Sequence, residues 1–146
     1  MNLAAPTNAT IADNQGVGTI VDDDAPILAT EQNSQRALAL DLVTFVRDPF
    51  AVTNSHYFGS DKRTRIILFA TNLSLTPGLV VTAKAVDSQQ TNYALPVEFV
   101  GSLPAFLGST QVVVKLPDGI VNAGDLQVSI TVRGRTSNIV LVGVTP

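Results

Sequence analysis

The chain contains no cysteine and no tryptophan, and only 14% of its 146 residues are charged. Without cysteine, a disulfide framework, a thiolate metal site and a cysteine nucleophile are all excluded. The charged fraction lies well below the roughly 25% of average globular chains, which argues against disorder through self-repulsion. The hydrophobic content of 45% is enough for one domain with its own core.

The sequence also lacks a basic stripe and a long apolar run. The formal net charge is -3, and the nine Lys and Arg residues are scattered along the chain. Nucleic-acid binding needs clustered cations that neutralise phosphates, so no nucleic-acid partner is expected. No apolar run approaches the roughly 18 residues that span a bilayer, so no membrane insertion is expected. Residues 1–4 do not resemble a signal peptide, and export would therefore require a longer precursor or a signal already removed.

What is present is an alternation of apolar and polar side chains with a period of two. Its clearest case is residues 126–132, where four apolar residues alternate with polar ones. This run predicts a strand with one buried and one solvated face. A turn at 133–136 and an apolar run over 139–144 predict that this strand forms a hairpin.

Further strands are predicted between breakers that contain glycine, proline or short polar residues. They cover residues 38–46, 65–71, 80–87, 93–100 and 111–116. Residues 31–42 could also form a short helix because of their Ala and Leu content, but the alternation of Leu38, Leu40 and Leu42 favours a strand from residue 38 onward. Strands at this spacing, without a long helical period, predict an all-β fold, an antiparallel β-sandwich of about seven to nine strands.

The N-terminal residues 8–24 contain two strand-forming runs, a turn at Asp13-Asn14-Gln15-Gly16 between them, and three consecutive aspartates at the end. This pattern resembles the C-terminal end of a Calx-beta domain, an extracellular calcium-associated β-sandwich module. Residues 1–25 are therefore predicted to be a remnant of such a domain end. A linker rich in Thr, Gln, Asn and Ser over 26–35 then leads into a main domain over 36–146.

The remnant strands have no partner strands upstream in this chain. An apolar strand needs a sheet edge that satisfies its backbone groups, either on the main domain or on a neighbouring subunit. Donation to a neighbour would assemble the chain with itself as a homo-oligomer or filament. Assembly by β-strand donation is therefore one prediction, and packing within the chain is the alternative.

The main domain carries a second resemblance. Its landmarks are the runs Arg65–Leu73, Leu103–Val112, Val114–Gly119 and Val128–Asn138. Their order and spacing are similar to a C-terminal β domain found at the ends of large secreted acidobacterial proteins, over about Arg63 to Val144. The resemblance implies an Ig-like fold and an extracellular or cell-surface location, and it brings no catalytic residues.

Asp22, Asp23 and Asp24 are the best candidates for a metal site. Calcium takes about six to eight oxygen ligands, and clustered carboxylates can supply several of them. In the resembled module these terminal acids bind calcium together with acids from other loops. Because those loops are missing here, a calcium ion would also need Asp13 or a neighbouring chain. The alternative is a solvated acidic linker without a bound ion.

His56 is the single histidine, and it offers little basis for catalysis. A general base needs a nucleophile or a polarised water nearby, and adjacent strand residues such as Ser55 point to the opposite face. With no second histidine and no cysteine, a zinc site is not expected. The sequence lacks a combination of nucleophile, base and orienting group, so the chain is not expected to be an enzyme.

The aromatic residues allow two interpretations. Phe50, Tyr57 and Phe58 could present a surface for a glycan or a protein. The alternative places most phenylalanines in the core, namely Phe45, Phe50, Phe69, Phe99 and Phe106. Taken together, these patterns predict a non-enzymatic extracellular structural or adhesive module, and the alternative is a calcium- or glycan-binding β-sandwich module.

Overall fold

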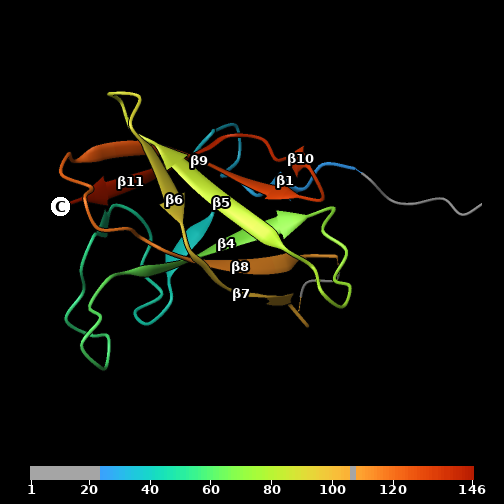
Figure 1. Cartoon of the computed structure of the whole chain (residues 1–146), viewed down its shortest axis with the longest axis horizontal. Coiled ribbons are helices and arrows are strands. Elements are labelled where there is room, and N and C mark those ends of the chain that lie inside the picture. The colour runs from blue at the N-terminus through green and yellow to red at the C-terminus, as the bar shows by residue number, and fades with distance from the viewer. Residues whose placement is uncertain (1–23, 106–107) are drawn as a thin grey trace, which may run out of the picture.

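The structure is a computed structural model that describes residues 24–105 and 108–146. Those residues form eleven strands and no helix (Figure 1). One sheet, here called the first sheet, contains β1 (Ile27–Leu28), β2 (Ala39–Asp41), β4 (Arg65–Thr71), β7 (Val97–Ser102) and β8 (Thr110–Lys115). The second sheet contains β3 (Phe50–Ala51), β5 (Val81–Val86), β6 (Asn92–Leu95), β9 (Gly124–Val132), β10 (Arg135–Thr136) and β11 (Val140–Thr145). The prediction of an all-β fold is confirmed.

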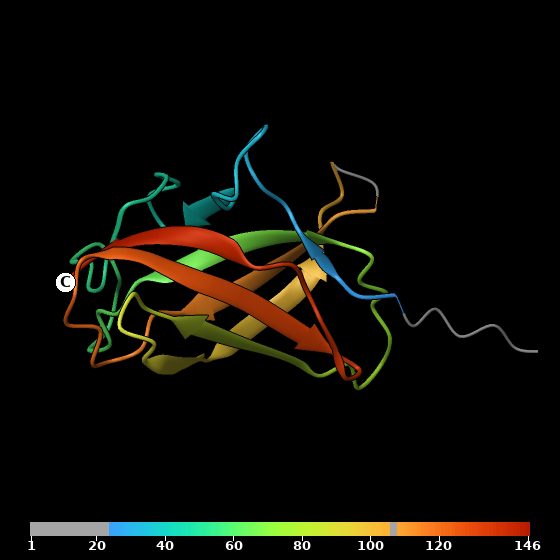
Figure 2. The ribbon, with the colours of Figure 1, turned by 90° about the horizontal axis from the view of Figure 1, so that it is seen from above.

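The two sheets are built almost entirely from antiparallel pairs. The first sheet has the order β1-β4-β8-β7, and β2 also pairs with β4. The second sheet has the order β3-β11-β9-β5-β6, and β10 also pairs with β9. Among the strands described, β3 and β11 form the one parallel pair. Figure 2 shows β9 and β11, in orange and red, running across β4 and β8, in green and gold, which is consistent with a β-sandwich.

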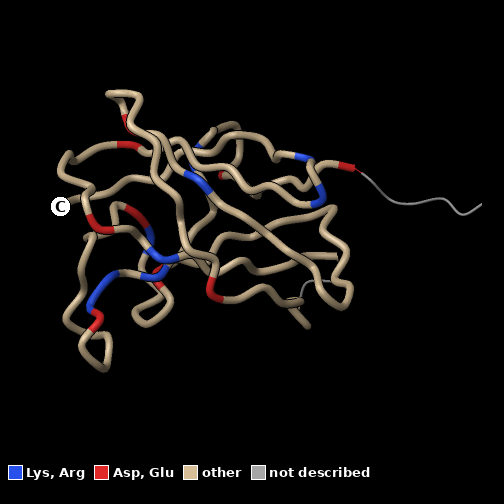
Figure 3. The backbone as a smooth tube through the Cα atoms, viewed as in Figure 1, with Lys and Arg blue, Asp and Glu red and all other residues tan. Residues whose placement is uncertain are grey.

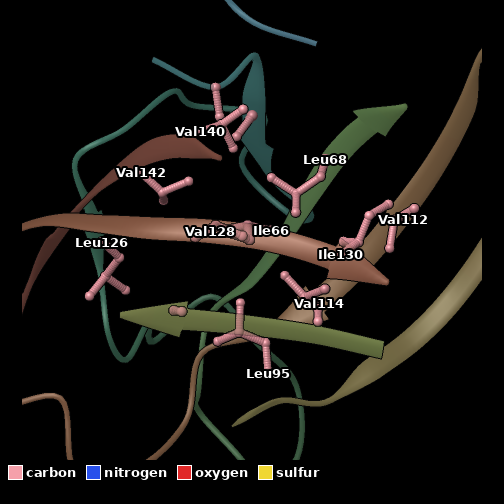
Figure 4. Packing of buried hydrophobic residues seen from close by; sticks show 14 of the residues in the cluster. Ile66, Leu68, Leu95, Val112, Val114, Leu126, Val128, Ile130, Val140 and Val142 are labelled. Atoms are coloured by element: carbon pink, nitrogen blue, oxygen red, sulfur yellow. The ribbon is translucent and has the colours of Figure 1, made fainter. Parts of the chain in front are cut away.

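One apolar core lies between the sheets. Burial of these side chains is the main favourable term in folding, because it removes apolar surface from water. Figure 4 shows side chains of both sheets pointing toward one another. Of the residues that it labels, Leu95 of the second sheet is 3% exposed and the others are at most 1% exposed, namely Ile66, Leu68, Val112 and Val114 in the first sheet and Leu126, Val128, Ile130, Val140 and Val142 in the second.

The predicted hairpin is present. β9 pairs with β11 in antiparallel register, from Val140 opposite Val128 to Val144 opposite Gly124. The predicted single strand over 93–100 is instead two strands, β6 and β7, which belong to different sheets. Pro96 lies between them, and proline cannot continue a ladder because it lacks the backbone N–H.

Residues 26–35 differ from the predicted linker. Ile27 and Leu28 pair with Thr71 and Ala70 at the end of β4, and Leu28 is only 2% exposed. The Asn138 side chain accepts a hydrogen bond from the Leu28 N–H and donates one to the Leu28 carbonyl. A short strand therefore forms within a mostly polar segment, because the buried Leu28 side chain and the hydrogen bonds to Asn138 hold its backbone against β4. Most of the predicted remnant, residues 1–23, lies outside the described residues.

The predicted strand over 38–46 is shorter in the structure, where β2 covers only Ala39–Asp41. β2 ends at Asp41, whose carboxylate accepts hydrogen bonds from the Val43 and Thr44 N–H groups and so turns the chain. Ala37 and Ala39 point into the core, whereas Leu38 is 38% exposed. The alternating leucines therefore mark the face that points away from the core. The alternative of a helix over 31–42 is wrong, because these residues form bridges, turns and β2.

The expectation that the phenylalanines fill the core is wrong for three of them. Phe50 is buried, at 3% exposed, but Phe45 is 64% exposed and Phe99 is 52% exposed. Phe69 is half-buried and lies outside the core cluster. Phe106 lies outside the described residues. Aliphatic side chains of both sheets fill most of the interior, and these three rings lie outside it.

Candidate functional site

The first sheet carries apolar residues on both of its faces. In β4, Ile66 and Leu68 point into the core, while Ile67 and Phe69 alternate with them and lie on the opposite face. In β8, Val113 lies on that opposite face in the same way, between Gln111 and Lys115. Ile67 and Val113 are only 5% and 3% exposed, so other side chains cover them. An antiparallel sheet with one solvated face normally carries polar residues there, so the apolar centre of this face is unusual.

The strand register joins these residues into one row across the sheet. Leu40 pairs with Ile67, Ile67 with Val113, and Val113 with Phe99. Paired residues in neighbouring strands share a face, so this row extends from β2 to the edge strand β7. We call the following set the outer apolar face: Leu38, Leu40, Ile67, Phe69, Phe99, Leu103 and Val113.

A groove of about 320 Å³ lies on this face, between residues of β1 and β2 on one side and Leu103 and Ser109, beside the ends of β7 and β8, on the other. Its walls are almost entirely apolar, and they come from Ala29, Leu38, Ala39, Leu40, Phe69 and Leu103. Arg47 and Ser109 contribute the polar atoms, and Arg47 forms an ion pair with Glu31. The groove therefore suits an apolar group rather than a charged one.

Phe99 projects from the β7 side of the same face. A Cβ atom placed on Gly101 would lie 2.6 Å from the Cζ atom of Phe99, so the ring lies directly over the Gly101 backbone. Only glycine leaves room for such a close approach within a strand. The ring is thus fixed in position although it is 52% exposed.

Ion pairs border the face at its other end. Arg65 contacts Glu98 at 3.0 Å and Asp61 at 2.9 Å, and Lys115 contacts Asp61 at 3.2 Å. The backbone N–H of Arg63, together with these cations, holds the pKa of Asp61 well below its usual range. Figure 3 shows lysine, arginine and acidic residues close together in this region. The cluster neutralises itself, so it offers no surplus charge to a ligand.

The second sheet provides an internal comparison. Its outward-facing residues in β5 and β9 are largely polar, and Thr82 pairs with Thr131 while Lys84 pairs with Ser129. Gln127 lies on the same face. This is the expected pattern for a sheet face in water. Solvent contact alone therefore does not explain the composition of the outer apolar face.

An apolar loop extends from the end of β2. The buried Asp41 carboxylate accepts hydrogen bonds from two backbone N–H groups, at 2.8 Å each, and from the Asn54 side chain at 3.2 Å. The loop that it holds presents apolar side chains between 36% and 64% exposed, namely Leu42, Val43, Phe45 and Val46. Phe45 has a φ of 56°, a left-handed conformation that is unfavourable for a bulky residue. Such strain persists only where surrounding contacts impose it.

The acidic site predicted from the sequence falls almost wholly outside the structure. Asp13, Asp22 and Asp23 lie outside the described residues, and Asp24, the first described residue, is exposed. Within residues 24–105 and 108–146, no three His, Cys, Asp or Glu side chains are grouped so that they could hold a metal ion. Calcium binding by Asp13, Asp22, Asp23 and Asp24 stays a prediction.

The predicted aromatic surface is not assembled. Tyr57 and Phe50 are buried, and the Tyr57 hydroxyl donates to the Arg65 carbonyl and accepts from the Arg65 N–H. Phe58 is 97% exposed. His56 is exposed, and its Nδ1 lies 2.7 Å from the Asn54 side-chain oxygen. These residues therefore do not form the stacked aromatic platform that a glycan site would need.

Sequence reasoning did not single out the outer apolar face. The signal was nevertheless present, because residues 66–70 and 112–114 are continuously apolar rather than alternating. Continuous apolar runs are typical of strands that are buried on both faces. In the structure the core covers one of these faces, and Ile67 and Val113 on the other face are also only 5% and 3% exposed.

Comparison with known proteins found no match: no family model, curated protein or solved structure matches the chain. The described residues include no helix with the length and apolarity to cross a membrane. The resemblances to a Calx-beta domain end and to an acidobacterial C-terminal domain stay predictions.

Proposed function

We propose that this chain is a non-enzymatic structural or adhesive module with an Ig-like fold, part of a secreted or cell-surface bacterial protein. It works by docking its outer apolar face onto another protein surface. The observation that carries this proposal is the contrast between the two sheets. The outward side of β4 and β8 carries Ile67, Phe69 and Val113 at its centre, whereas the outward side of β5 and β9 is largely polar.

The energetics favour a docked state for this face. Each Å² of apolar surface removed from water is worth about 25 cal/mol. Leu38 and Phe99, at opposite sides of the sheet, are 38% and 52% exposed and have surface left to bury, whereas Ile67 and Val113 between them are only 5% and 3% exposed.

The neighbouring charges favour a protein over a charged polymer or a lipid surface. An anionic partner needs cations that are not already neutralised. Here Arg47 pairs with Glu31, and Arg65 pairs with Asp61 and Glu98. The outer apolar face therefore presents hydrophobic area without a net electrostatic field.

The geometry gives less support to assembly by strand donation. The donor strands predicted within residues 8–21 lie outside the described residues. The available acceptor edges include β7 and β6, and β7 has an irregular register between Val97 and Phe99. Pro96 lies between β6 and β7. Bulges and proline are devices that limit pairing at an edge, so we propose docking by the face as the main route.

Photo-crosslinking in the producing cells tests this function. Benzoylphenylalanine placed at position 99 is expected to give covalent adducts with protein, because position 99 lies on the docking face. The same probe at position 84, on the outward side of the second sheet, is the matched control and should give few. Adducts with a second copy and adducts with another protein both support docking. Equal yields from positions 99 and 84, or no adduct from either, would contradict it.

A further inference from the structure

The turn between β8 and β9 carries a site for a covalent modification. Asp118 is followed by Gly119, and no other aspartate or asparagine in the chain is followed by glycine. We propose that Asp118 and Gly119 form an isoaspartyl linkage in the folded chain, through a cyclic imide and without an enzyme. This inference is independent of the docking function. It rests on the exposure of the Asp118 side chain and on the open surroundings of the Gly119 nitrogen.

The reaction needs only these two residues and water. The backbone nitrogen of Gly119 attacks Cγ of Asp118 and loses its proton, and the carboxyl group leaves as water, which closes the imide. Water then adds to one of the two imide carbonyls. Opening at the side-chain carbonyl restores aspartate, and opening at the main-chain carbonyl leaves the peptide linked through Cγ. One water leaves and one returns, so the mass is unchanged and nothing is oxidised or reduced.

The carboxyl group of Asp118 is open to this attack. Its side chain is 82% exposed, and its carboxylate forms an ion pair with Arg63 at 2.9 Å. Ion pairs this exposed are weak, so the contact opens readily and releases Cγ. Loop tips are also the parts of a domain that open without unfolding of the core.

Gly119 leaves its own nitrogen unshielded. No heavy atom lies within 4 Å of the place where a Cβ atom would stand, and the φ of 95° is one that glycine adopts without strain. Within residues 24–105 and 108–146, no group accepts a hydrogen bond from the Gly119 N–H. The nucleophile is therefore neither covered by a side chain nor held by an acceptor.

Asp87 is an internal comparison, because a small residue, serine, follows it as well. Its carboxylate accepts hydrogen bonds from the Gln89 and Thr91 N–H groups at 2.9 Å each and from the Tyr93 hydroxyl at 3.0 Å. The residue is only 5% exposed. The fold thus holds this carboxylate in place, whereas it leaves the one after β8 accessible.

The modification alters a turn that is anchored in the core on both sides. Leu116 is fully buried and Ile120 is 6% exposed. An isoaspartyl linkage adds one carbon to the main chain between these two anchors. The carboxylate is then attached directly to the main chain, without the methylene through which it now reaches Arg63. We therefore expect the ion pair between Asp118 and Arg63 to be lost.

Storage of the full chain under native conditions tests the inference. Isoaspartyl groups are labelled by an isoaspartate methyltransferase with S-adenosylmethionine, and the labelled peptides are identified by mass spectrometry. Label is expected to accumulate with time in the peptide that contains residues 118–119, as a second chromatographic species of the same mass. The peptide that contains residues 87–88 should stay at background. Asp118→Ser, which keeps a polar side chain but removes the carboxyl group, should abolish the label in its peptide.

The same assay in urea shows whether the fold selects the site. Without the hydrogen bonds to Asp87, both aspartates are expected to gain label. Label at position 118 that appears only in urea would overturn the inference, because the folded turn would then keep the Gly119 nitrogen away from Cγ. Equal labelling at positions 87 and 118 in the folded chain, or label that persists in the Asp118→Ser peptide, would also overturn it.

Discussion

Replacement of Leu68 by alanine is expected to lower the free energy of unfolding by about 3 kcal/mol, the usual cost of deleting a fully buried leucine side chain. Leu68 is 1% exposed and belongs to the core between the sheets. Its neighbour Phe69 lies on the outer apolar face, so Phe69→Thr should cost only about 1 kcal/mol in the monomer. Adjacent residues of one strand thus have very different effects.

Urea unfolding at low concentration measures both losses without a contribution from association. Thr82→Ala, on the outward side of the second sheet, is the control and should change the free energy of unfolding by less than about 0.5 kcal/mol. Equal losses for Leu68→Ala and Phe69→Thr would contradict the assignment of inner and outer faces. Such equal losses would show that another part of the chain covers Phe69 as completely as the core covers Leu68.

The second large effect is expected at Asp41. Asp41→Ala removes the acceptor for the Val43 and Thr44 N–H groups and for the Asn54 side chain. Buried donors without a partner cost about 1–3 kcal/mol, and these donors are only partly buried, so we expect a loss of about 1–2 kcal/mol. Asp41→Asn keeps one acceptor oxygen in place and should lose less. Thermal unfolding of the two variants at neutral pH gives the comparison, and equal losses would contradict the role of the carboxylate.

The same residue predicts a dependence on pH. Burial raises the pKa of Asp41, but hydrogen bonds from Thr44, Val43 and Asn54 together lower it by more than burial raises it. The pKa in the folded chain therefore lies below its ordinary value. The carboxylate therefore stabilises the fold above the ordinary aspartate pKa of about 4, and this contribution is lost as the pH falls through the folded pKa. The deficit of Asp41→Ala should shrink in acid. A deficit that is the same at pH 3 and pH 7 would contradict this ionisation.

The sequence was sufficient to predict β5, β9 and β11 of the second sheet and the all-β fold class. The alternation over residues 126–132 is clear because one face of β9 meets the core and the other meets water. Around β2 the alternation of Leu38, Leu40 and Leu42 predicted a strand but did not show which of its faces meets the core. Small residues at 37 and 39 point inward and the leucines point outward, and periodicity alone carries no information about which face meets the core.

The outer apolar face depends on register, which a single sequence does not show. Leu40, Ile67, Val113 and Phe99 lie in one row only because β2, β4, β8 and β7 pair as they do. The run over 66–70 indicated a strand that is apolar on both sides. The run alone could not show which side chains cover each of the two faces. The acidic candidates stay a prediction for a different reason, because Asp13, Asp22 and Asp23 lie outside the described residues.

Thiol labelling of Leu38→Cys tests most directly whether the outer apolar face is a docking surface. The chain has no cysteine of its own, so each variant carries a single thiol. In the purified chain in dilute solution the thiol at position 38 should react readily, and in the producing cells it should be protected, because the docked protein covers it. The thiol of Lys84→Cys should react equally in both settings. A thiol at position 38 that reacts as readily in the cells as in the purified chain would contradict docking through this face.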